Sequence, residues 1–503
     1  MDIKRAKQEI KDAVEAYLIK NEYGEYEIPA IRQRPVLLMG PPGIGKTQIM
    51  EQIAKEMGIG LVSYTITHHT RQSAVGLPFI REKEYGGESC SVTEYTMSEI
   101  IGSVYEKMEQ TGCREGILFL DEINCVSETL APAMLQFLQG KTFGTHRLPD
   151  GWIIVAAGNP PEYNKSVREF DVVTLDRLKK IDVEADFPAW KEYAYRQGIH
   201  QAVISYLDLR RENFYRMENT VDGRRFATAR GWEDLSRLIQ VYEMLGKTVD
   251  RDVVYQYIQH RGIAKDFANY LELYYKYRTD YKVEDILKGI WNRSVLEKIQ
   301  SASFDEHLSV ISLINAKLSG MFKECYLADA YIGKLHGYLI CYRENRSVTM
   351  LDDVRALAEK DLEEQRHAEL LTRQQEHILL RAADTLSRFS RNIKGEISAP
   401  DKAFDEVRDM FAGEKEELDK MISRTSEALD NAFRFLEDAF GESQEMVSFV
   451  TELNAGYYSV WFIKENGSDL YYKYNKGLLF DERHEGVVRQ MDEVESILNT
   501  GIK

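Results

Sequence analysis

The sequence predicts an α/β domain with a parallel sheet, then a helical lid, then a mostly α-helical region with a long helical hairpin. Five short apolar runs lie in the first 185 residues, and helical patterns separate several of them. Apolar runs without alternation are typical of strands buried on both faces of a parallel sheet. Near residue 186 such runs stop, and only helical patterns follow. Three domains are therefore expected, at 1–185, 186–284 and 285–503.

An amphipathic helix opens the chain, with one apolar face made by Ile3, Ala6, Ile10, Val14 and Tyr17. Five strands are expected after it, at 35–39, 61–66, 117–120, 152–157 and 180–184. Helices are expected between several of them, for instance at 46–57 and 97–110. Because alternating strands and helices pack as helices on a sheet, this part of the chain predicts a three-layer α/β domain.

The remainder of the chain has helical periodicity. Lid helices are expected at 188–209, 228–245, 250–259 and 262–279. Residues 350–393 contain neither Gly nor Pro and predict one long helix, which the segment KGEISAPD at 394–401 ends. A coiled-coil-like seam then follows, formed by Leu418, Ile422, Thr425, Leu429, Ala432, Leu436 and Ala439. An antiparallel hairpin is the favoured arrangement and an ordinary helical bundle the alternative. The aromatic-rich tail, 446–503, is expected to form a small β-containing cap.

Composition excludes several classes of protein. The chain has 503 residues and a net charge of −17, which argues against a protein that coats nucleic acid, because phosphate neutralisation needs clustered Lys and Arg. Its five cysteines form no C-x-x-C pair, which favours free thiols in a reducing compartment. No segment resembles a secretory signal or a membrane span. A cytoplasmic protein is expected.

Residues 40–47 read GPPGIGKT and stand between the first expected strand and the helix at 46–57. The pattern G-x-x-x-x-G-K-[ST] in this context predicts a P-loop, the phosphate-binding loop of nucleoside triphosphatases. Its glycines let backbone N–H groups form an anion nest at a helix N-terminus. Lys46 is expected to reach the β- and γ-phosphates of ATP, and the Thr47 hydroxyl to ligate Mg²⁺. The expected nucleotide-binding residues are Gly40, Pro41, Pro42, Gly43, Ile44, Gly45, Lys46, Thr47 and Gln48.

Two strand ends carry the polar side chains that hydrolysis needs. In ILFLDEIN, Asp121 ends a buried strand and is expected to hold Mg²⁺, while Glu122 can act as the general base on the attacking water. In IIVAAGNPPEYN, Asn159 ends a strand and could orient that water. A solvated acidic turn and a simple Asn-Pro turn are the alternatives. The Asp-Glu pair is typical of ATPases that hydrolyse ATP repeatedly. Small GTPases and nucleotide kinases usually lack a Glu directly after the magnesium-binding Asp, so the pair argues against these two classes.

The segments GPPGIGKT, LFLDEIN, VAAGNP and TLDRL, followed by a helical lid, resemble the AAA+ superfamily and more closely its MoxR-type ATPases. The resemblance covers roughly residues 25–280. It implies that Asn159 is the sensor-1 residue. It also implies that Arg177, in TLDRL, is the arginine finger that reaches the ATP of a neighbouring subunit, with Arg168 as the alternative. Fingers of this kind contribute about 10³–10⁵ in rate.

The same resemblance assigns roles outside the strand ends. Arg230 matches a sensor-2 arginine at the start of a lid helix; the alternatives are Arg225 or a plain helix-start charge. Tyr26 to Ile31 stand where such proteins usually wall the adenine. The chain departs from the MoxR pattern in having Leu178 where that pattern has Phe after the arginine.

Two segments predict hairpins. Residues 67–96 have EYGG at the expected tip, and residues 140–152 form a shorter, similar stretch. The resemblance implies that the first faces the pore of a ring and that the second is a pre-sensor-1 hairpin. A surface turn is the alternative for both. Adjacent His68 and His69 on an extended segment would point to opposite faces, which argues against a shared metal ion.

The favoured function is an ATP-driven remodelling machine. The MoxR-type resemblance implies a homo-oligomeric ring, expected to be a hexamer, that acts on a protein client as a chaperone. It also implies a partner with a von Willebrand factor type A domain, for which residues 285–503 would be a docking arm. A DNA-translocating motor of a restriction or repair system is the alternative, against which the net charge argues. A nucleotide-gated scaffold without turnover is a third class, against which the intact catalytic set argues.

Overall fold

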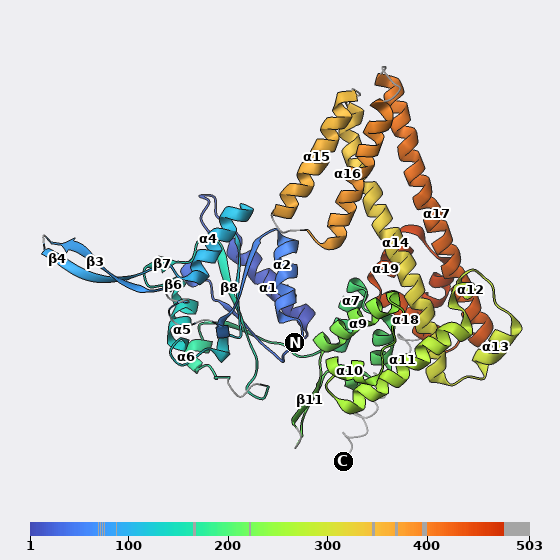
Figure 1. Ribbon diagram of the computed structural model, residues 1–503, viewed down its shortest axis with the longest axis horizontal. Coiled ribbons are helices and arrows are strands. Elements are labelled where there is room, and N and C mark those ends of the chain that lie inside the picture. The colour runs from blue at the N-terminus through green and yellow to red at the C-terminus, as the bar shows by residue number, and fades with distance from the viewer. Residues whose placement is uncertain are drawn as a thin grey trace, which may run out of the picture. The chain divides into compact units, whose positions relative to one another are not determined.

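The computed structural model describes residues 1–68, 70, 72, 74, 76–86, 88–163, 167–220, 223–344, 348–367, 371–394 and 400–476. The chain divides into two compact units. The first contains residues 1–190, 228–231 and 359–376, and the second contains residues 191–227 and 232–358 and continues from 377 onward. Figure 1 shows the elements of both.

A five-stranded parallel sheet forms the centre of the first unit, in the order β2–β5–β8–β1–β9. Its strands are β1 (Val36–Met39), β2 (Gly60–Thr65), β5 (Gly116–Asp121), β8 (Trp152–Gly158) and β9 (Lys179–Asp182). All five predicted strands are confirmed, each within two residues of its expected ends. Every residue of β8 is buried, as is all of β5 except its last residue. Because β5, β8 and β1 are parallel neighbours, their carboxyl ends lie side by side at one edge of the sheet.

Helices accompany this sheet in the first unit. They are α1 (Ile3–Leu18), α2 (Lys46–Met57), α4 (Glu99–Thr111), α5 (Ala131–Gly140) and the single turn α6 (Val172–Leu175). The predicted amphipathic face of α1 is buried at Ala6, Ile10 and Val14. Asp2 caps this helix, because its side chain accepts a hydrogen bond from the Arg5 amide at 2.8 Å. The α/β core expected from the sequence is thus confirmed.

Both predicted hairpins are present in the first unit. The longer one pairs β3 (Pro78–Tyr85) with β4 (Glu88–Tyr95) and extends away from the sheet (Figure 1). The shorter one pairs β6 (Thr142–Phe143) with β7 (His146–Arg147). His69 and the side chain of His68 lie outside the described residues, so the expectation about that pair stays a prediction.

The second unit holds the lid helices, except for the first residues of α7 and α9, and a hairpin that the sequence did not predict. Helix α7 (Phe187–Gln197) leads into α8 (Gln201–Leu209), and α9 (Ala229–Met244), α10 (Arg251–Tyr257) and α11 (Arg261–Tyr281) follow. Between α8 and α9, strands β10 (Arg216–Thr220) and β11 (Gly223–Ala227) pair antiparallel. The expectation that strands stop near residue 186 was therefore wrong. These two strands are polar and bury only Ala227, so no apolar run marked them.

The mostly helical C-terminal region is confirmed, and its long helices form a bundle. Two short helices, α12 (Val283–Leu287) and α13 (Arg293–Gln300), precede the long helices α14 (Phe304–Glu344), α15 (Val348–His367), α16 (Arg373–Lys394) and α17 (Pro400–Phe440). One helix was expected over 350–393, but the chain forms two there. A single apolar core includes Leu335 of α14, Val354 of α15, Leu386 of α16 and Val407 of α17. This packing corresponds to the bundle alternative more closely than to a simple pair of helices.

The tail contains helices where a β-containing cap was expected. Helix α18 (Gln444–Ala455) buries Phe449 and Leu453, and α19 (Tyr457–Asn466) buries Phe462. The cap prediction was therefore wrong for the described part of the tail, and residues 477–503 lie outside it. Aromatic residues are enriched in strands, which favoured the wrong interpretation. Within the described ranges, no helix combines the length and the apolar character needed to cross a membrane.

Candidate active site

The loop between β1 and α2 contains two glycines in the left-handed backbone conformation, which is compatible with an anion-binding nest. Gly43 and Gly45 adopt φ angles of +76° and +96°, a region that side chains other than hydrogen disfavour. Gly40 has no room for a β-carbon, because one built there would lie 2.7 Å from the Val183 carbonyl oxygen. The loop opens directly into α2, which begins at Lys46. Glycine is thus required by conformation at two positions of the predicted phosphate loop and by space at a third.

Lys46 is buried at the start of α2 and carries the charge of the loop. Its Nζ donates hydrogen bonds at 2.8, 2.9 and 2.9 Å to the carbonyls of Gly40 and Pro41 and to Oδ1 of Asn159. Burial lowers the pKa of Lys46 to about 8; the Asp121 carboxylate opposes this shift and the Arg230 guanidinium adds to it. Because Asp121 and Arg230 both act on this ammonium, the structure brings three separate predicted site residues together with Asn159.

Asp121 and Thr47 supply oxygen ligands of the kind that Mg²⁺ prefers. The Thr47 hydroxyl donates to Oδ2 of Asp121 at 3.1 Å, and Oδ1 of Asp121 accepts from the Glu122 amide at 2.9 Å. One oxygen therefore comes from the first turn of α2 and the other from the end of β5. This donor pair fits the predicted Mg²⁺ site.

Glu122 stands directly after β5 in a left-handed backbone conformation, with a φ of 56°. Holding a non-glycine residue in this conformation costs of order 1–3 kcal/mol of folding free energy, and such residues cluster at functional sites. The Oε2 atom of Glu122 accepts a hydrogen bond of 2.9 Å from the Thr67 hydroxyl, which follows β2. The predicted general base is therefore positioned by its own strained backbone and by a side chain from the turn that follows β2.

Asn124 is a positioning residue that the sequence analysis missed. It lies in the 3₁₀ turn η3 (Ile123–Cys125) and is buried. Its Nδ2 donates to the Asn159 carbonyl at 2.8 Å, and its Oδ1 accepts from the Asn159 amide at 3.3 Å. A β-carbon on Gly158 would lie 2.6 Å from the Asn124 Oδ1. Asn124 thus fixes the backbone of the sensor-1 candidate, and no linear pattern signals this contact.

Arg230 lies beside the phosphate loop, as its predicted role requires. Its amide donates to the Gly43 carbonyl at 3.1 Å, and the Cβ of Thr228 lies 3.2 Å from the place of a β-carbon on Gly43. The start of α9 therefore packs on the loop within the first unit. Arg225, the alternative, lies on β11 opposite Glu218 in the second unit.

The two candidates for the arginine finger lie on the surface of the first unit. Arg177 is exposed just after α6, and its guanidinium donates to the side chain of Gln139 on α5. Arg168 is also exposed and pairs with Glu128 at 2.6 Å. The structure thus brings neither guanidinium onto Lys46 or Asp121 of its own chain, and their role stays a prediction.

Tyr26 does not lie near the phosphate loop. Its hydroxyl bonds to Glu115 at 3.0 Å and would lie 2.4 Å from a β-carbon on Gly151. Both neighbours immediately precede strands β5 and β8, whereas the loop follows the carboxyl end of β1. Tyr26 is therefore at the opposite edge of the sheet, and the expectation that it walls the adenine was wrong.

Comparison with known proteins identifies this region. Residues 36–175 match the model of the family described as "ATPase family associated with various cellular activities (AAA)". This part of the chain is therefore an AAA ATPase domain, which agrees with the coarser of the two resemblances seen in the motifs. The match extends over less than a third of the chain. No curated protein matches the sequence.

Two solved structures of NtrX from Brucella abortus are similar to part of the chain. The structure in complex with ADP has 17% identity and a TM-score of 0.23 and covers 40% of this chain and 40% of NtrX. A second NtrX structure has 16% identity and a TM-score of 0.21 and covers 38% of this chain and 44% of NtrX. The chain thus spans less than half the length of the NtrX chains, and at such scores the likeness supports no conclusion.

Proposed function

We propose that the chain, whose residues 36–175 form an AAA ATPase domain, is a Mg²⁺-dependent ATPase that remodels a protein client. One observation carries the proposal. Side chains from the loop after β1 and from the ends of β5 and β8 converge, since Lys46 bonds to Asn159 and Thr47 bonds to Asp121. These are the groups that bind a nucleoside triphosphate and its metal, and Glu122 stands next to them.

Each residue has a separate task in this proposal. Bound ATP with Mg²⁺ supplies the phosphoanhydride bond that is hydrolysed. Lys46 and the loop amides hold the phosphate oxygens, while Thr47 and Asp121 hold the metal. Glu122 accepts a proton from the attacking water, and Asn159 orients that water. Arg230 links the loop to the start of α9, so a change in the loop is transmitted to the lid helix.

The finer parts of the proposal rest on the motif resemblance. We assign the chain to the MoxR type, acting in the cytoplasm as a homo-oligomeric ring, with a hexamer as the expected form. A protein with a von Willebrand factor type A domain is the proposed partner. The exposed position of Arg177 supports a finger that acts on a neighbouring subunit, because the guanidinium is accessible from outside its own chain.

Substitution of Glu122 by Gln tests this function. The Glu122→Gln variant keeps the shape and the Thr67 contact but cannot accept a proton. Turnover is expected to fall about 10²- to 10⁴-fold while ATP still binds. Glu109→Gln, which changes an exposed carboxylate on α4, is the matched control and should turn over ATP like the original chain. Unchanged turnover in the Glu122 variant would refute the assigned base.

The same variant tests the client. A chain that holds ATP without hydrolysing it should retain its protein client, so capture from the native cytoplasm should be stronger with ATP than with ADP. Equal recovery with both nucleotides, when ATP binding itself is intact, would count against a remodelling role and leave only the ATPase activity.

A further inference from the structure

The β3–β4 hairpin is a ribbon of two strands, to which no third strand is paired in the described part of the chain. Its pairing runs from Pro78 with Tyr95 to Tyr85 with Glu88, and it extends away from the sheet of the first unit (Figure 1). Each strand therefore has an outer edge, where backbone N–H and C=O groups face away from the other strand. Such an edge is a template for a further strand. The ATPase mechanism assigns this hairpin no task.

The register of the hairpin determines which residues present these outward groups. In an antiparallel pair of strands, hydrogen-bonded residue pairs alternate with pairs that are not bonded. The Thr96 amide donates to the Leu77 carbonyl at 2.9 Å, so the bonded pairs continue at every second position along the hairpin. Residues of the pairs between them direct their backbone groups outward. On β4 these residues are Ser89, Ser91, Thr93 and Tyr95, and on β3 they are Pro78, Ile80, Glu82 and Glu84.

The base of the β4 edge is already occupied by the β6–β7 hairpin. Nε2 of His146 on β7 donates to the Tyr95 carbonyl at 2.9 Å. A β-carbon on Gly144, in the turn of that hairpin, would lie 3.4 Å from Cδ2 of Tyr95. The bond from His146 shows that the Tyr95 carbonyl points away from β3, as the alternation requires. The part of the edge that stays open among the described residues thus runs from Thr93 through Ser91 to Ser89.

The two outer edges of the ribbon differ in chemistry. Strand β3 begins with Pro78, which has no N–H, and alternates cations with carboxylates from Arg81 to Glu84. Proline and charged side chains are devices by which proteins prevent an edge from pairing. The five residues from Ser89 to Thr93 read SCSVT and contain no charge, proline or glycine. Strand β3 therefore has a protected edge, and β4 has an open one.

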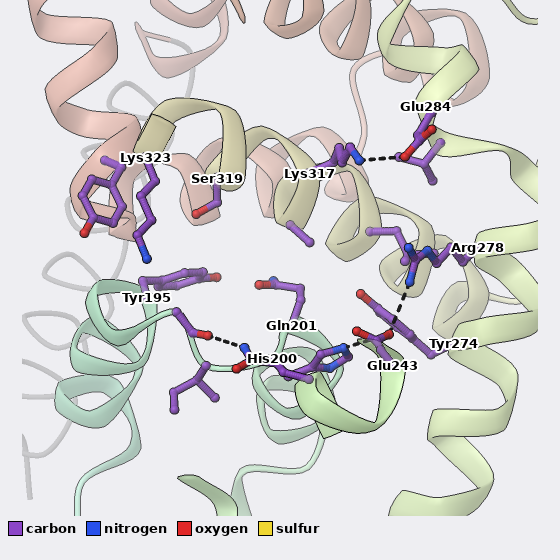
Figure 2. Close-up of a pocket in the computed structure, with 18 of the residues that line it drawn as sticks. Tyr195, His200, Gln201, Glu243, Tyr274, Arg278, Glu284, Lys317, Ser319 and Lys323 are labelled. Atoms are coloured by element: carbon purple, nitrogen blue, oxygen red, sulfur yellow. Dashed lines mark hydrogen bonds and ion pairs between the residues drawn. The ribbon is translucent and has the colours of Figure 1, made fainter. Parts of the chain in front are cut away.

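A cavity in the second unit, by contrast, has charges that are matched within the chain. The cavity has a volume of about 750 Å³. On its wall, Glu243 pairs with Arg278 at 3.3 Å and Glu284 pairs with Lys317 at 2.7 Å (Figure 2). These four charges are neutralised by one another and select no partner from outside. The outward backbone groups of β4 differ, because the described residues provide no strand that pairs with them.

The charge of the hairpin indicates what kind of strand fits the open edge. Residues 78–95 contain two cations and four carboxylates, which gives a net charge of −2. Arg81 and Lys83 both pair with Glu94. The other carboxylates have no ion-pair partner in the ranges that the structure describes: Glu82, Glu84 and Glu88. Because opposite charges on neighbouring strands are stabilising, a strand that carries Lys or Arg is favoured over an acidic one.

A second copy of β4 is disfavoured by the same charges. In the antiparallel register that overlaps residues 88–94 of both copies, Ser91 stands opposite Ser91 and Glu88 stands opposite Glu94 at each end. Like charges directly opposite each other are destabilising. The open edge therefore suits a basic strand from another protein better than a copy of itself.

We propose that the outer edge of β4 binds an extended, basic segment of a protein partner as a third strand. Ser89, Ser91 and Thr93 supply the backbone hydrogen bonds, and the unpaired carboxylates of the hairpin select Lys or Arg. Main-chain pairing of this kind provides affinity without requiring one exact sequence. The inference deepens the proposed remodelling function and rests on it, because the partner is the protein client.

A peptide of seven residues, Lys-Val-Thr-Val-Thr-Val-Lys with blocked ends, matches the edge from Glu88 to Glu94. Its binding to the full chain is measured by fluorescence anisotropy of a labelled peptide, with saturating ADP and Mg²⁺. Saturable binding is expected at submillimolar concentration. The control peptide Lys-Val-Thr-Pro-Thr-Val-Lys has the same charge but lacks the central N–H, so it should bind about tenfold more weakly.

Two matched variants test which edge is used. Ser91→Pro removes an outward N–H of β4 without removing a bond to β3, and it should weaken binding of the basic peptide about tenfold. Ile80→Pro removes an outward N–H of β3 in the same way and should leave binding within twofold. Exchange of the inward Val92 amide, measured in both variants, reports whether the hairpin itself is intact.

Amide hydrogen exchange in the original chain locates the bound peptide directly. Binding should slow exchange at Ser89, Ser91 and Thr93 and leave the outward amides of β3 unchanged. The proposal is overturned if the basic peptide shows no saturable binding at millimolar concentration, or if Ser91→Pro binds it normally. Slower exchange on β3 alone would overturn it too.

These measurements involve no ATP hydrolysis, so they separate this inference from the proposed function. If the peptide pairs with β4 but the Glu122→Gln variant retains no client, the remodelling function fails and the edge is a peptide site without that role. If the variant retains a client but the peptide does not bind, the inference about β4 fails alone.

Discussion

The ammonium of Lys46 sits among loop carbonyls with little access to water, and its pKa of about 8 follows from that burial. At pH 7 the group is mostly charged, and it loses its proton as the pH rises through 8. The unfolded chain keeps this proton until about pH 10.4. Between these values the unfolded state binds more protons, so the contribution of Lys46 to the free energy of unfolding rises with pH.

Nucleotide affinity should follow the charge of Lys46 in the opposite direction. We expect the affinity for ADP with Mg²⁺ to fall as the pH rises above about 8, by up to tenfold per pH unit, because the neutral amine no longer attracts phosphate. Titration calorimetry between pH 7 and pH 9.5 measures this. Lys46→Arg keeps its charge over the whole range, so a comparable fall in that variant would trace the effect to another group.

Asn124 should matter for catalysis although it is not expected to touch the nucleotide. Asn124→Ala removes two hydrogen bonds to the backbone of Asn159 and leaves buried polar groups unpaired, which costs about 1–3 kcal/mol of stability for each. We expect a lower kcat with little change in nucleotide affinity, because the Asn159 side chain loses its support. Denaturation and steady-state assays measure both; normal kcat in a destabilised variant would indicate a purely structural role.

The residues that a linear motif contains could be located from the sequence, and those that depend on tertiary contacts could not. Lys46, Thr47 and Asp121 lie in short patterns whose chemistry requires those residue types at that spacing. Asn124 also lies in a motif, LFLDEIN, but the motif does not show that its side chain bonds to the backbone of Asn159. That contact exists only because β5 and β8 are adjacent in the sheet. Tyr26 was misplaced for the same reason, since its distance in sequence from the loop says nothing about which edge of the sheet it reaches.

Among the elements, the β3–β4 hairpin and the strands of the central sheet differ in what they contribute to stability. The hairpin is exposed over nearly its whole length, whereas Phe119 on β5 is fully buried. Burial of apolar surface dominates stability, so loss of the hairpin should cost little and loss of a core side chain should cost much.

Replacing residues 79–94 by a short Gly-Ser link should leave the free energy of unfolding nearly unchanged and ADP binding intact. Phe119→Ala, in contrast, should cost about 3–5 kcal/mol. Chemical denaturation with ADP titration compares the two. A large loss of stability in the shortened chain would mean that the hairpin supports the core in a way its exposure does not reveal.

Elements that bury apolar runs were predictable, and elements that bury little were not. The five strands of the sheet appear in the sequence as runs such as ILFL and WIIVAA. Strands β10 and β11 are rich in charged residues and leave no such trace. The break between α15 and α16 falls in a stretch without Gly or Pro, so neither of the usual helix-ending residues marked it.

At the scale of the whole molecule, the proposed ring makes turnover a property of pairs of chains. Arg177→Ala should abolish turnover but retain ATP binding, and Glu122→Gln should do the same. In a mixture of the two variants, some neighbouring pairs combine an intact Glu122 with an intact Arg177. Turnover should therefore reappear on mixing, to roughly a quarter of the original rate, because the proposed finger acts between chains.

A steady-state assay at fixed total protein, with varied ratios of the two variants, measures this recovery. In the control, Arg168→Ala replaces Arg177→Ala, both alone and in the mixture with Glu122→Gln. The arginine whose substitution abolishes turnover alone, and whose variant regains turnover on mixing, is the finger. No recovery at any ratio, although the two chains associate, would show that both residues act within one chain.

The left-handed backbone at Glu122 has a consequence for anyone who tries to make this protein more robust. Glycine relaxes that conformation without strain, so a selection for heat resistance alone should favour Gly at position 122. Such a protein would survive heating better and no longer hydrolyse ATP. Laboratory evolution of this chain therefore needs activity in its selection from the first round.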